Sequence, residues 1–257
     1  MTAFPDSTSR RVIALCYGVI CHVCFALGMG AMIVAMFFGM SRSFGVVPAP
    51  WNWAANAALL VQFPVLHSAL VTGRGRGILQ RLAPRGTGST LSTSTFATIA
   101  AVQTLALFAL WSPSGIVWWR AQGLALAVLT VLYATSWLSL GYSMYCAGLG
   151  LQTGSLGWTA LWAGRPPRYP AMPDTGVFRL IRQPIYVCFA LTLWTVPTWT
   201  PDQLVVAVVL TAYCVLAPRL KERRYRRIYG EKFYNYAQRV PYWIPLTVPG
   251  STPRPSA

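Results

Sequence analysis

Carboxylate side chains are scarce in this sequence of 257 residues. The five acidic residues are Asp6, Asp174, Asp202, Glu222 and Glu231. A calcium or magnesium site draws most of its ligands from oxygen atoms, with carboxylates prominent among them. So few acids exclude a carboxylate-rich metal site, and any acid beside a polar cluster is a candidate functional group.

Metal ligands of other kinds are also rare. The chain has two histidines, His22 and His67, and six cysteines that lie in or beside apolar stretches, where we expect buried free thiols. Cys21 and Cys24 form a C-x-x-C pair, but it lies within an apolar run and has no second pair elsewhere. Zinc or redox chemistry is therefore not indicated, and we predict no metal site.

Hydrophobic runs dominate what remains. Apolar residues make up 55% of the chain and charged residues 10%, and several runs approach or exceed the roughly 20 residues that cross a bilayer. The first run continues with no small-residue cleavage site, which favours a retained helix over a signal peptide. The sequence predicts an all-α, polytopic integral membrane bundle with about six transmembrane segments. These lie near residues 12–38, 51–71, 93–111, 122–145, 184–199 and 203–216.

The chain divides by composition into three parts. Residues 1–147 hold the first four segments, preceded by about nine loose residues. Residues 148–245 hold a Gly- and Pro-rich connector, a helical hairpin and a tail. The two hairpin segments are short, so we expect tilt or partial insertion. Residues 219–239 predict one basic amphipathic helix on the membrane surface, and residues 246–257 are predicted to be disordered.

The positive charge of +16 follows the connections between apolar runs. Of the 21 Lys and Arg residues, only Arg42 and Arg120 fall in the connections on one side, and the others fall on the opposite side or in the termini. The positive-inside rule then places both termini and the open end of the hairpin in the cytoplasm, as in a bacterial inner membrane. We expect contact with membrane lipids and no nucleic-acid binding, because basic and aromatic residues are not interleaved outside the tail.

Polar residues gather at the open end of the hairpin. Arg182 and Gln183 precede Pro184, which is suited to the first position of a helix and leaves free backbone N–H groups there. That helix end favours a carboxylate or phosphate. Tyr186 follows one turn inside, and Glu222 returns to the same end. A zwitterionic ligand and a simple Arg182–Glu222 ion pair both remain open.

A family resemblance rests on four motifs. Arg-Gln-Pro-Ile-Tyr (182–186), Lys-Glu-Arg (221–223), Tyr-Gly-Glu-x-Phe-x-x-Tyr (229–236) and Val-Pro-x-x-Ile-Pro (240–245) follow one another around the hairpin. Together they resemble the isoprenylcysteine carboxyl methyltransferase superfamily of membrane enzymes. Upstream, Gln-Phe-Pro-Val-Leu-His-Ser (62–68) and Gly-Arg-Pro (164–166) look like the methanethiol S-methyltransferase branch.

The resemblance implies a methyltransferase that uses S-adenosylmethionine. It also implies that the cofactor is bound by Arg182, Gln183, Pro184, Tyr186 and Glu222. A small thiol, or another apolar or lipid-like molecule, would accept the methyl group, with His67 and Tyr186 as candidate catalytic residues. The sequence does not indicate an oligomeric state.

Three residues depart from the family pattern. Gln183 replaces a histidine, Cys188 a glycine and Lys221 the first of two glutamates; residues 144–153 also lack a His-Phe-Asp-type segment. Gln183 can hydrogen-bond a carboxylate but cannot titrate, and Lys221 reverses a charge. A membrane isomerase or cyclase, a binding protein without methyl transfer and a structural subunit are therefore alternative functions.

Overall fold

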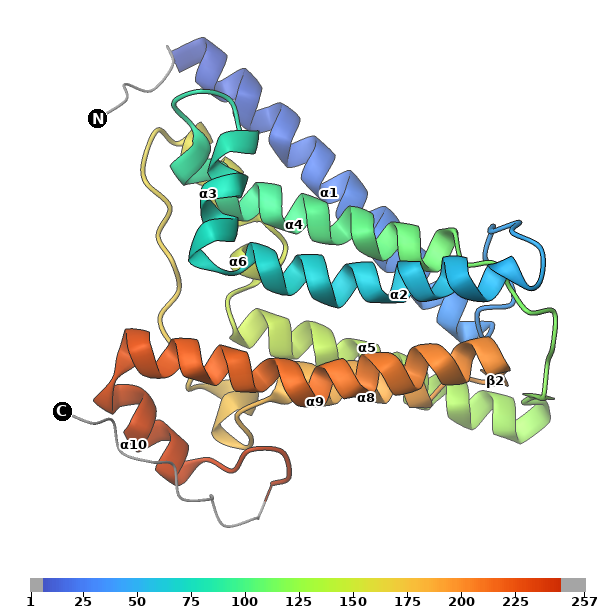
Figure 1. Ribbon diagram of the computed structural model, residues 1–257. Coiled ribbons are helices and arrows are strands. Elements are labelled where there is room, and N and C mark those ends of the chain that lie inside the picture. Colours follow the sequence, from blue (N-terminus) through green and yellow to red (C-terminus); the bar gives the residue numbers. More distant parts are fainter. Residues whose placement is uncertain (1–6, 246–257) are drawn as a thin grey trace. The chain divides into compact units, whose positions relative to one another are not determined.

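The computed structural model describes residues 7–245, and this part of the chain is built almost entirely of helices (Figure 1). The chain forms two compact units. One unit holds residues up to 118, 150–169 and 200–202, and the other holds the remaining residues. Within the described range, five helices are long and apolar enough to cross a membrane. The predicted all-α polytopic bundle is confirmed.

The helices of each unit follow in chain order. The first unit contains α1 (Ser7–Phe37), α2 (Trp51–Leu70), α3 (Gly73–Leu82), α4 (Gly88–Ala109) and α7 (Ser155–Trp162). The second contains β1 (Trp119–Arg120), α5 (Gly123–Cys146), the 3-10 turn η1 (Gly176–Arg179), α8 (Pro184–Trp194), β2 (Thr198–Trp199), most of α9 (Pro201–Tyr229) and α10 (Glu231–Arg239). A four-residue helix, α6 (Leu149–Gln152), begins at the boundary between them.

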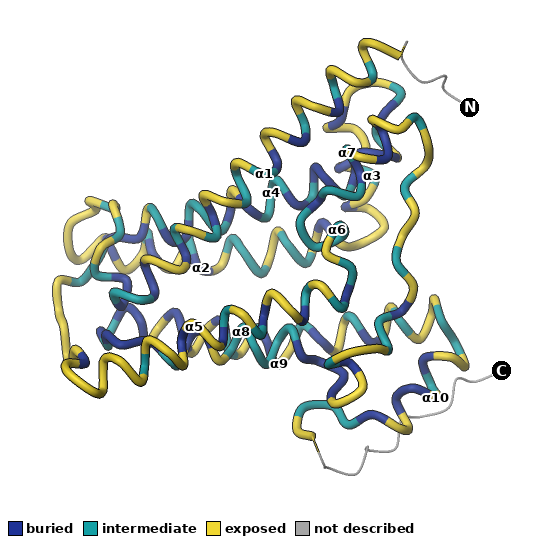
Figure 2. Tube along the Cα trace, turned by 180° about the vertical axis from the view of Figure 1, so that it is seen from behind, coloured by how far each residue is buried: buried dark blue, intermediate teal, exposed yellow. Residues whose placement is uncertain are grey.

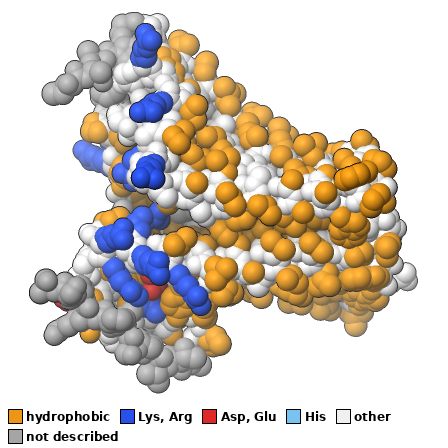
Figure 3. Space-filling model, in the orientation of Figure 1, with side chains coloured by type: hydrophobic (Ala, Val, Ile, Leu, Met, Phe, Trp, Pro, Cys, Tyr) orange, Lys and Arg blue, Asp and Glu red, His pale blue; other side chains and the backbone are white. Residues whose placement is uncertain are grey.

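Large apolar side chains are exposed along the spanning helices. Figure 2 shows exposed residues recurring along α1, α2 and α5, and Figure 3 shows hydrophobic side chains covering much of the visible face. Leu124 and Leu138 on α5 are 81% and 74% exposed. Such a surface is unfavourable in water but is the surface that lipid tails contact. The protein is therefore an integral membrane protein.

In the first unit, α4 packs against α1, α2, α3 and α7. The backbones of α1 and α4 approach so closely that a Cβ atom on Gly28 would lie 2.7 Å from the carbonyl oxygen of Ala101. Between α2 and α4, the Gln103 amide donates to both the backbone and side-chain oxygens of Gln62, at 2.8 and 2.7 Å. Small residues and paired amides therefore join these helices without exposing polar groups to lipid.

A buried carboxylate anchors the start of α9 within the first unit. Asp202 is 1% exposed and accepts hydrogen bonds from the Trp111 indole at 2.9 Å and from the Ser114 backbone N–H at 3.1 Å. The Ser114 hydroxyl also donates to it. Its place in the first turn of α9 is favourable for a negative charge.

In the second unit, α8 packs on α5 but is shorter than predicted. Its 11 residues span about 16 Å, which is half of a bilayer's apolar thickness. The predicted helix over residues 184–199 was wrong beyond Trp194, because Val196 precedes Pro197 and is disfavoured from helical geometry. The chain instead forms a short antiparallel ladder, with Trp199 opposite Trp119.

By contrast, α9 is longer than predicted. The expected segment 203–216 continues through Pro218 to Tyr229. There Gly230 takes a positive φ of 49°, which glycine adopts more readily than other residues, and α10 begins after it. The single tail helix predicted over residues 219–239 is therefore two helices.

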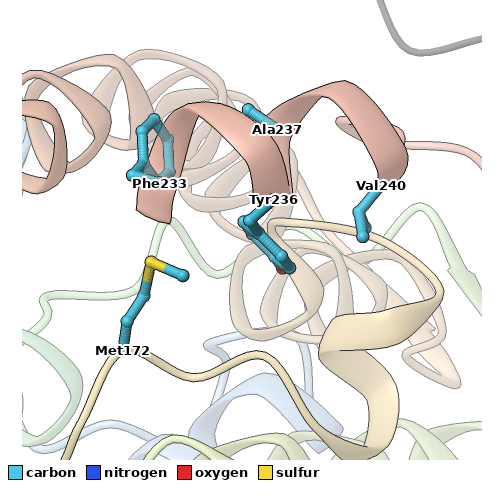
Figure 4. Packing of buried hydrophobic residues seen from close by; sticks show 5 residues of the cluster. All are labelled: Met172, Phe233, Tyr236, Ala237 and Val240. Carbon is cyan, nitrogen blue, oxygen red and sulfur yellow. The ribbon is translucent and has the colours of Figure 1, made fainter. Parts of the chain in front are cut away.

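The apolar face of α10 is buried inside the protein. Phe233, Tyr236, Ala237 and Val240 pack with Met172 of the connector (Figure 4), and Tyr225 and Tyr229 of α9 lie against the cluster. The connector therefore covers the apolar face of α10, so this face packs on protein.

Three other differences are local. Residues 7–9 already belong to α1, and α3 and α7 lie where a loop and a connector were expected. Thr72 begins α3 by accepting a hydrogen bond from the Gly75 N–H, which offsets the glycine-rich sequence that follows.

All six cysteines are free as expected; Cys21 and Cys214 are buried, but Cys16 is exposed. The predicted disordered tail, residues 246–257, lies outside the described residues.

We expect Asp202→Ala to lower the free energy of unfolding by about 2–3 kcal/mol, because three neutral donors lose a charged acceptor in a buried site. Asp174→Ala is the matched control, since Asp174 makes only a partly exposed pair with Lys232 at 3.6 Å. That pair contributes less than about 0.5 kcal/mol. Unfolding followed by circular dichroism in detergent micelles measures both, and equal losses would contradict an anchoring role for Asp202.

Candidate functional site

The candidate site forms around Glu222, a carboxylate that is 4% exposed near the end of α9. Arg182, itself 6% exposed, places its Nε atom 3.4 Å from Glu222 Oε1. Arg226 lies one turn along α9, with Nη2 3.8 Å from Oε2. The Arg182–Glu222 pair, one of the two alternatives that the sequence left open, is therefore present, and Arg226 adds a second positive charge beside Glu222.

Gln183 connects Glu222 to Lys221. Its Nε2 donates to Glu222 Oε1 at 2.9 Å, and its Oε1 accepts from Lys221 Nζ at 2.8 Å. A carboxylate only accepts and an ammonium only donates, so the orientation of the amide is unambiguous. The two residues that depart from the family pattern therefore contact each other.

Aromatic rings surround the Lys221 ammonium. Its Nζ atom lies 5.8, 5.6 and 5.5 Å from the ring centres of Phe178, Tyr186 and Tyr225. Cations are attracted to aromatic faces at such distances. The rings stabilise this positive charge together with the Gln183 oxygen and the adjacent Glu222.

The chain after α10 folds back onto the start of α8. The Arg182 backbone N–H donates to the Pro241 carbonyl at 2.9 Å, and the Arg182 guanidinium lies 4.9 Å from the Tyr242 ring centre. Burial, with a contribution from Glu222, raises the pKa of Tyr242 to about 12, so its hydroxyl stays neutral at physiological pH. Burial likewise raises the pKa of Tyr236, whose hydroxyl donates to the Phe178 carbonyl at 2.7 Å.

A groove of about 330 Å³ opens beside Glu222. We call it the arginine groove; it is lined by Val215, Arg219, Glu222, Arg223, Arg226, Tyr242 and Trp243. Figure 3 shows Lys and Arg side chains gathered over this end of α9. Glu222 therefore contacts Gln183 and Arg182 and also lines a cavity that a ligand can enter.

The structure brings together most of the predicted site residues. Arg182, Gln183 and Glu222 are in direct contact, Pro184 opens α8 beside them, and Tyr186 contributes a ring around Lys221. His67 belongs to the first unit, where it lies between Phe63 and Phe96, with ring centres 5.2 and 4.9 Å away. Within the described residues its Nδ1 atom has no hydrogen-bond partner.

Sequence reasoning missed several residues of the site. Lys221 was noted only as a departure, and Phe178, Tyr225 and Tyr242 were not identified. The altered charge at Lys221 was a usable signal, because a lysine beside a buried acid needs an acceptor and Gln183 was the uncharged residue facing it. The contact of Tyr242 with Arg182 depends on the fold of the tail and had no local sequence signal.

These observations define a polytopic helical membrane protein whose polar site lies at the end of a C-terminal helical hairpin. No family model matches the chain, and no solved structure matches it. It is 26% identical over 250 residues to a methanethiol S-methyltransferase of Crocosphaera subtropica, covering 94% of this chain and 95% of that protein.

Two further relatives carry the same name. A Pseudomonas protein is 25% identical over 248 residues, with 92% of each chain covered. A Mycobacterium tuberculosis protein is 24% identical over 243 residues, covering 92% of this chain and 97% of its own. The resemblance to this branch of the isoprenylcysteine carboxyl methyltransferase-like group, first indicated by the motifs, is confirmed along most of the chain.

We expect the Gln183–Lys221 contact to make substitutions at these positions non-additive. Gln183→Leu and Lys221→Met each leave a buried partner unsatisfied, so the double variant should lose about 1 kcal/mol less than the sum of the single variants. Unfolding in detergent measures this cycle. As a control, Gln183→Leu combined with Lys232→Met should be additive, because Lys232 pairs with Asp174 instead. Additivity in both cycles would show that the contact is not energetically significant.

Proposed function

We propose that this protein is an integral-membrane methyltransferase that uses S-adenosylmethionine to methylate a small thiol or another apolar acceptor. One observation carries the proposal: over 92–94% of its length the chain is similar to proteins named methanethiol S-methyltransferase. The polar cluster adds support, because it lies in the motifs that first indicated this resemblance.

The residues of the cluster fit the charged groups of such a cofactor. Arg182 keeps a buried Nη1 atom that has no hydrogen-bond partner among the described residues, which suits a carboxylate. Glu222 is an acceptor for an ammonium or for ribose hydroxyls. The first turn of α8 adds backbone N–H groups that no side chain caps.

When bound, S-adenosylmethionine would supply an electrophilic methyl group to the sulfur of a thiol that loses its proton. Arg182 and Glu222 would bind and orient the charged ends of the cofactor, while Gln183 and Lys221 hold Glu222 in place. Alignment of this kind, in a site shielded from water, accounts for much of the acceleration of a displacement reaction. The Tyr242 ring covers the Arg182 side of the cluster.

The catalytic roles are assigned to Tyr186 and His67. A thiol attacks as its thiolate, so a neutral imidazole that accepts its proton would assist the reaction. The Nδ1 atom of His67 is available for this purpose within the described part of the chain. Tyr186 would orient the acceptor through its hydroxyl.

We also propose that the cluster faces the cytoplasm in a bacterial inner membrane. The distribution of Lys and Arg supports this orientation through the positive-inside rule. Cytosolic S-adenosylmethionine would then reach the site directly, and an apolar acceptor could enter from the bilayer.

Calorimetry on the purified protein in detergent tests the cofactor site. We expect wild type to bind S-adenosylhomocysteine and Glu222→Gln to bind it about tenfold or more weakly, because a charged acceptor is lost. Glu231→Gln is the matched control, since Glu231 is an exposed acid on α10, and its affinity should be unchanged. Absence of wild-type binding at millimolar concentration would refute the proposal.

Kinetics separate the two proposed catalytic residues from cofactor binding. Tyr186→Phe and His67→Gln should each lower kcat by about tenfold or more while leaving cofactor affinity within about twofold of wild type. Tyr186→Phe keeps the ring beside Lys221, so its effect reports on the hydroxyl alone. A wild-type kcat in either variant would remove that residue from the catalytic set.

A further inference from the structure

One stripe of α9 changes from apolar to cationic along its length. Positions three and four apart share a helix face, and the exposed residues of this face are Val205, Val208, Ala212, Val215, Arg219, Arg223 and Arg226. The apolar half belongs to the membrane-spanning part of the helix, because no charged residue occurs between Asp202 and Arg219. The arginines therefore begin where the bilayer's apolar region ends.

The cationic half of this stripe forms the wall of the arginine groove. Three arginines and one glutamate line the groove, which gives a net charge of +2. Glu222 already contacts Arg226, Arg182 and Gln183, whereas Arg219 and Arg223 make no ion pair within residues 7–245. Two guanidinium groups are thus available to an anion.

The other residues that line the groove indicate whether that anion is soluble or part of an apolar molecule. Val215 is 44% exposed and continues the apolar stripe into the groove. Tyr242 and Trp243 form the remaining wall, and such amphipathic rings are favoured at the level of lipid headgroups. A soluble anion would use the arginines but not the apolar stripe.

We propose that the arginine groove binds the phosphate of an anionic phospholipid whose acyl chain lies along Val205–Val215 of α9. Basic pockets beside transmembrane helices recognise headgroups of this charge. A zwitterionic lipid is disfavoured, because its own cation would meet a groove of net positive charge. The bound lipid would border Glu222 and so form one edge of the candidate site.

Thermal unfolding of delipidated protein in neutral detergent tests this site. Phosphatidylglycerol is titrated against phosphatidylcholine with the same acyl chains, and a lipid that binds the folded state raises Tm. We expect phosphatidylglycerol to raise Tm more at equal concentration. Arg219→Gln/Arg223→Gln should weaken its apparent affinity by about tenfold or more.

A matched double variant on the same helix distinguishes lipid binding in the groove from a general effect of positive charge on α9. Arg224→Gln/Arg227→Gln removes two exposed arginines that do not line the groove, and its affinity should stay within about twofold of wild type. Equal losses in both double variants would overturn the proposal, as would an equal response to phosphatidylcholine.

Two further measurements test the remaining alternatives. Inorganic phosphate at the same concentration should leave Tm unchanged, and a shift equal to that of phosphatidylglycerol would show an anion site without lipid specificity and contradict the proposal. If the groove double variant does not fold, Arg223→Gln is compared with Arg227→Gln by native mass spectrometry of lipids retained from membranes. Equal retention of anionic lipid would then refute it.

Discussion

The burial of one carboxylate, Glu222, is the constraint on which the rest of the candidate site depends. A carboxylate removed from water is stable only if cations and hydrogen-bond donors replace the water. Arg182, Gln183 and Arg226 provide them. Arg182 and Gln183 lie just before α8 and Arg226 lies on α9, so both arms of the hairpin contribute. The segment after α10 completes the arrangement, because Pro241 and Tyr242 hold Arg182 in place. The extension of α9 beyond its apolar part places Glu222 and Arg226 beside Arg182, and the chain after α10 covers Arg182 from the other side.

The same constraint gives the two departures from the family motif a common physical explanation. A neutral histidine at position 183 could also donate to Glu222 and accept from Lys221, but protonation near neutral pH would turn the acceptor into a donor. Glutamine keeps one donor and one acceptor at every pH. Gln183 thus holds Glu222 without titrating itself, and the acid at position 222 is kept although the residues beside it differ from the motif.

The first four spanning helices could be predicted from the sequence, because their hydrophobic runs are long and flanked by polar connections. Sequence reasoning failed where tertiary contacts decide the structure. The apolar face of α10 has the pattern of a membrane-surface helix, and only the position of Met172 shows that the connector covers it. Arg182, Gln183 and Glu222 were predicted from motif and helix-end chemistry, whereas the aromatic rings around Lys221 come from three separate segments that no local pattern joins. The prediction of a single tail helix was wrong at Gly230, because the positive φ of this residue separates α9 from α10.

We propose that the buried Glu222, held by Arg182 and Gln183, serves methyl transfer to an apolar thiol. The most direct measurement incubates proteoliposomes with methyl-labelled S-adenosylmethionine and methanethiol and analyses the headspace for labelled dimethyl sulfide. We expect labelled product with wild type and its loss with Glu222→Ala. Bound cofactor with no labelled thioether from wild type would contradict a role of this site in thiol methylation.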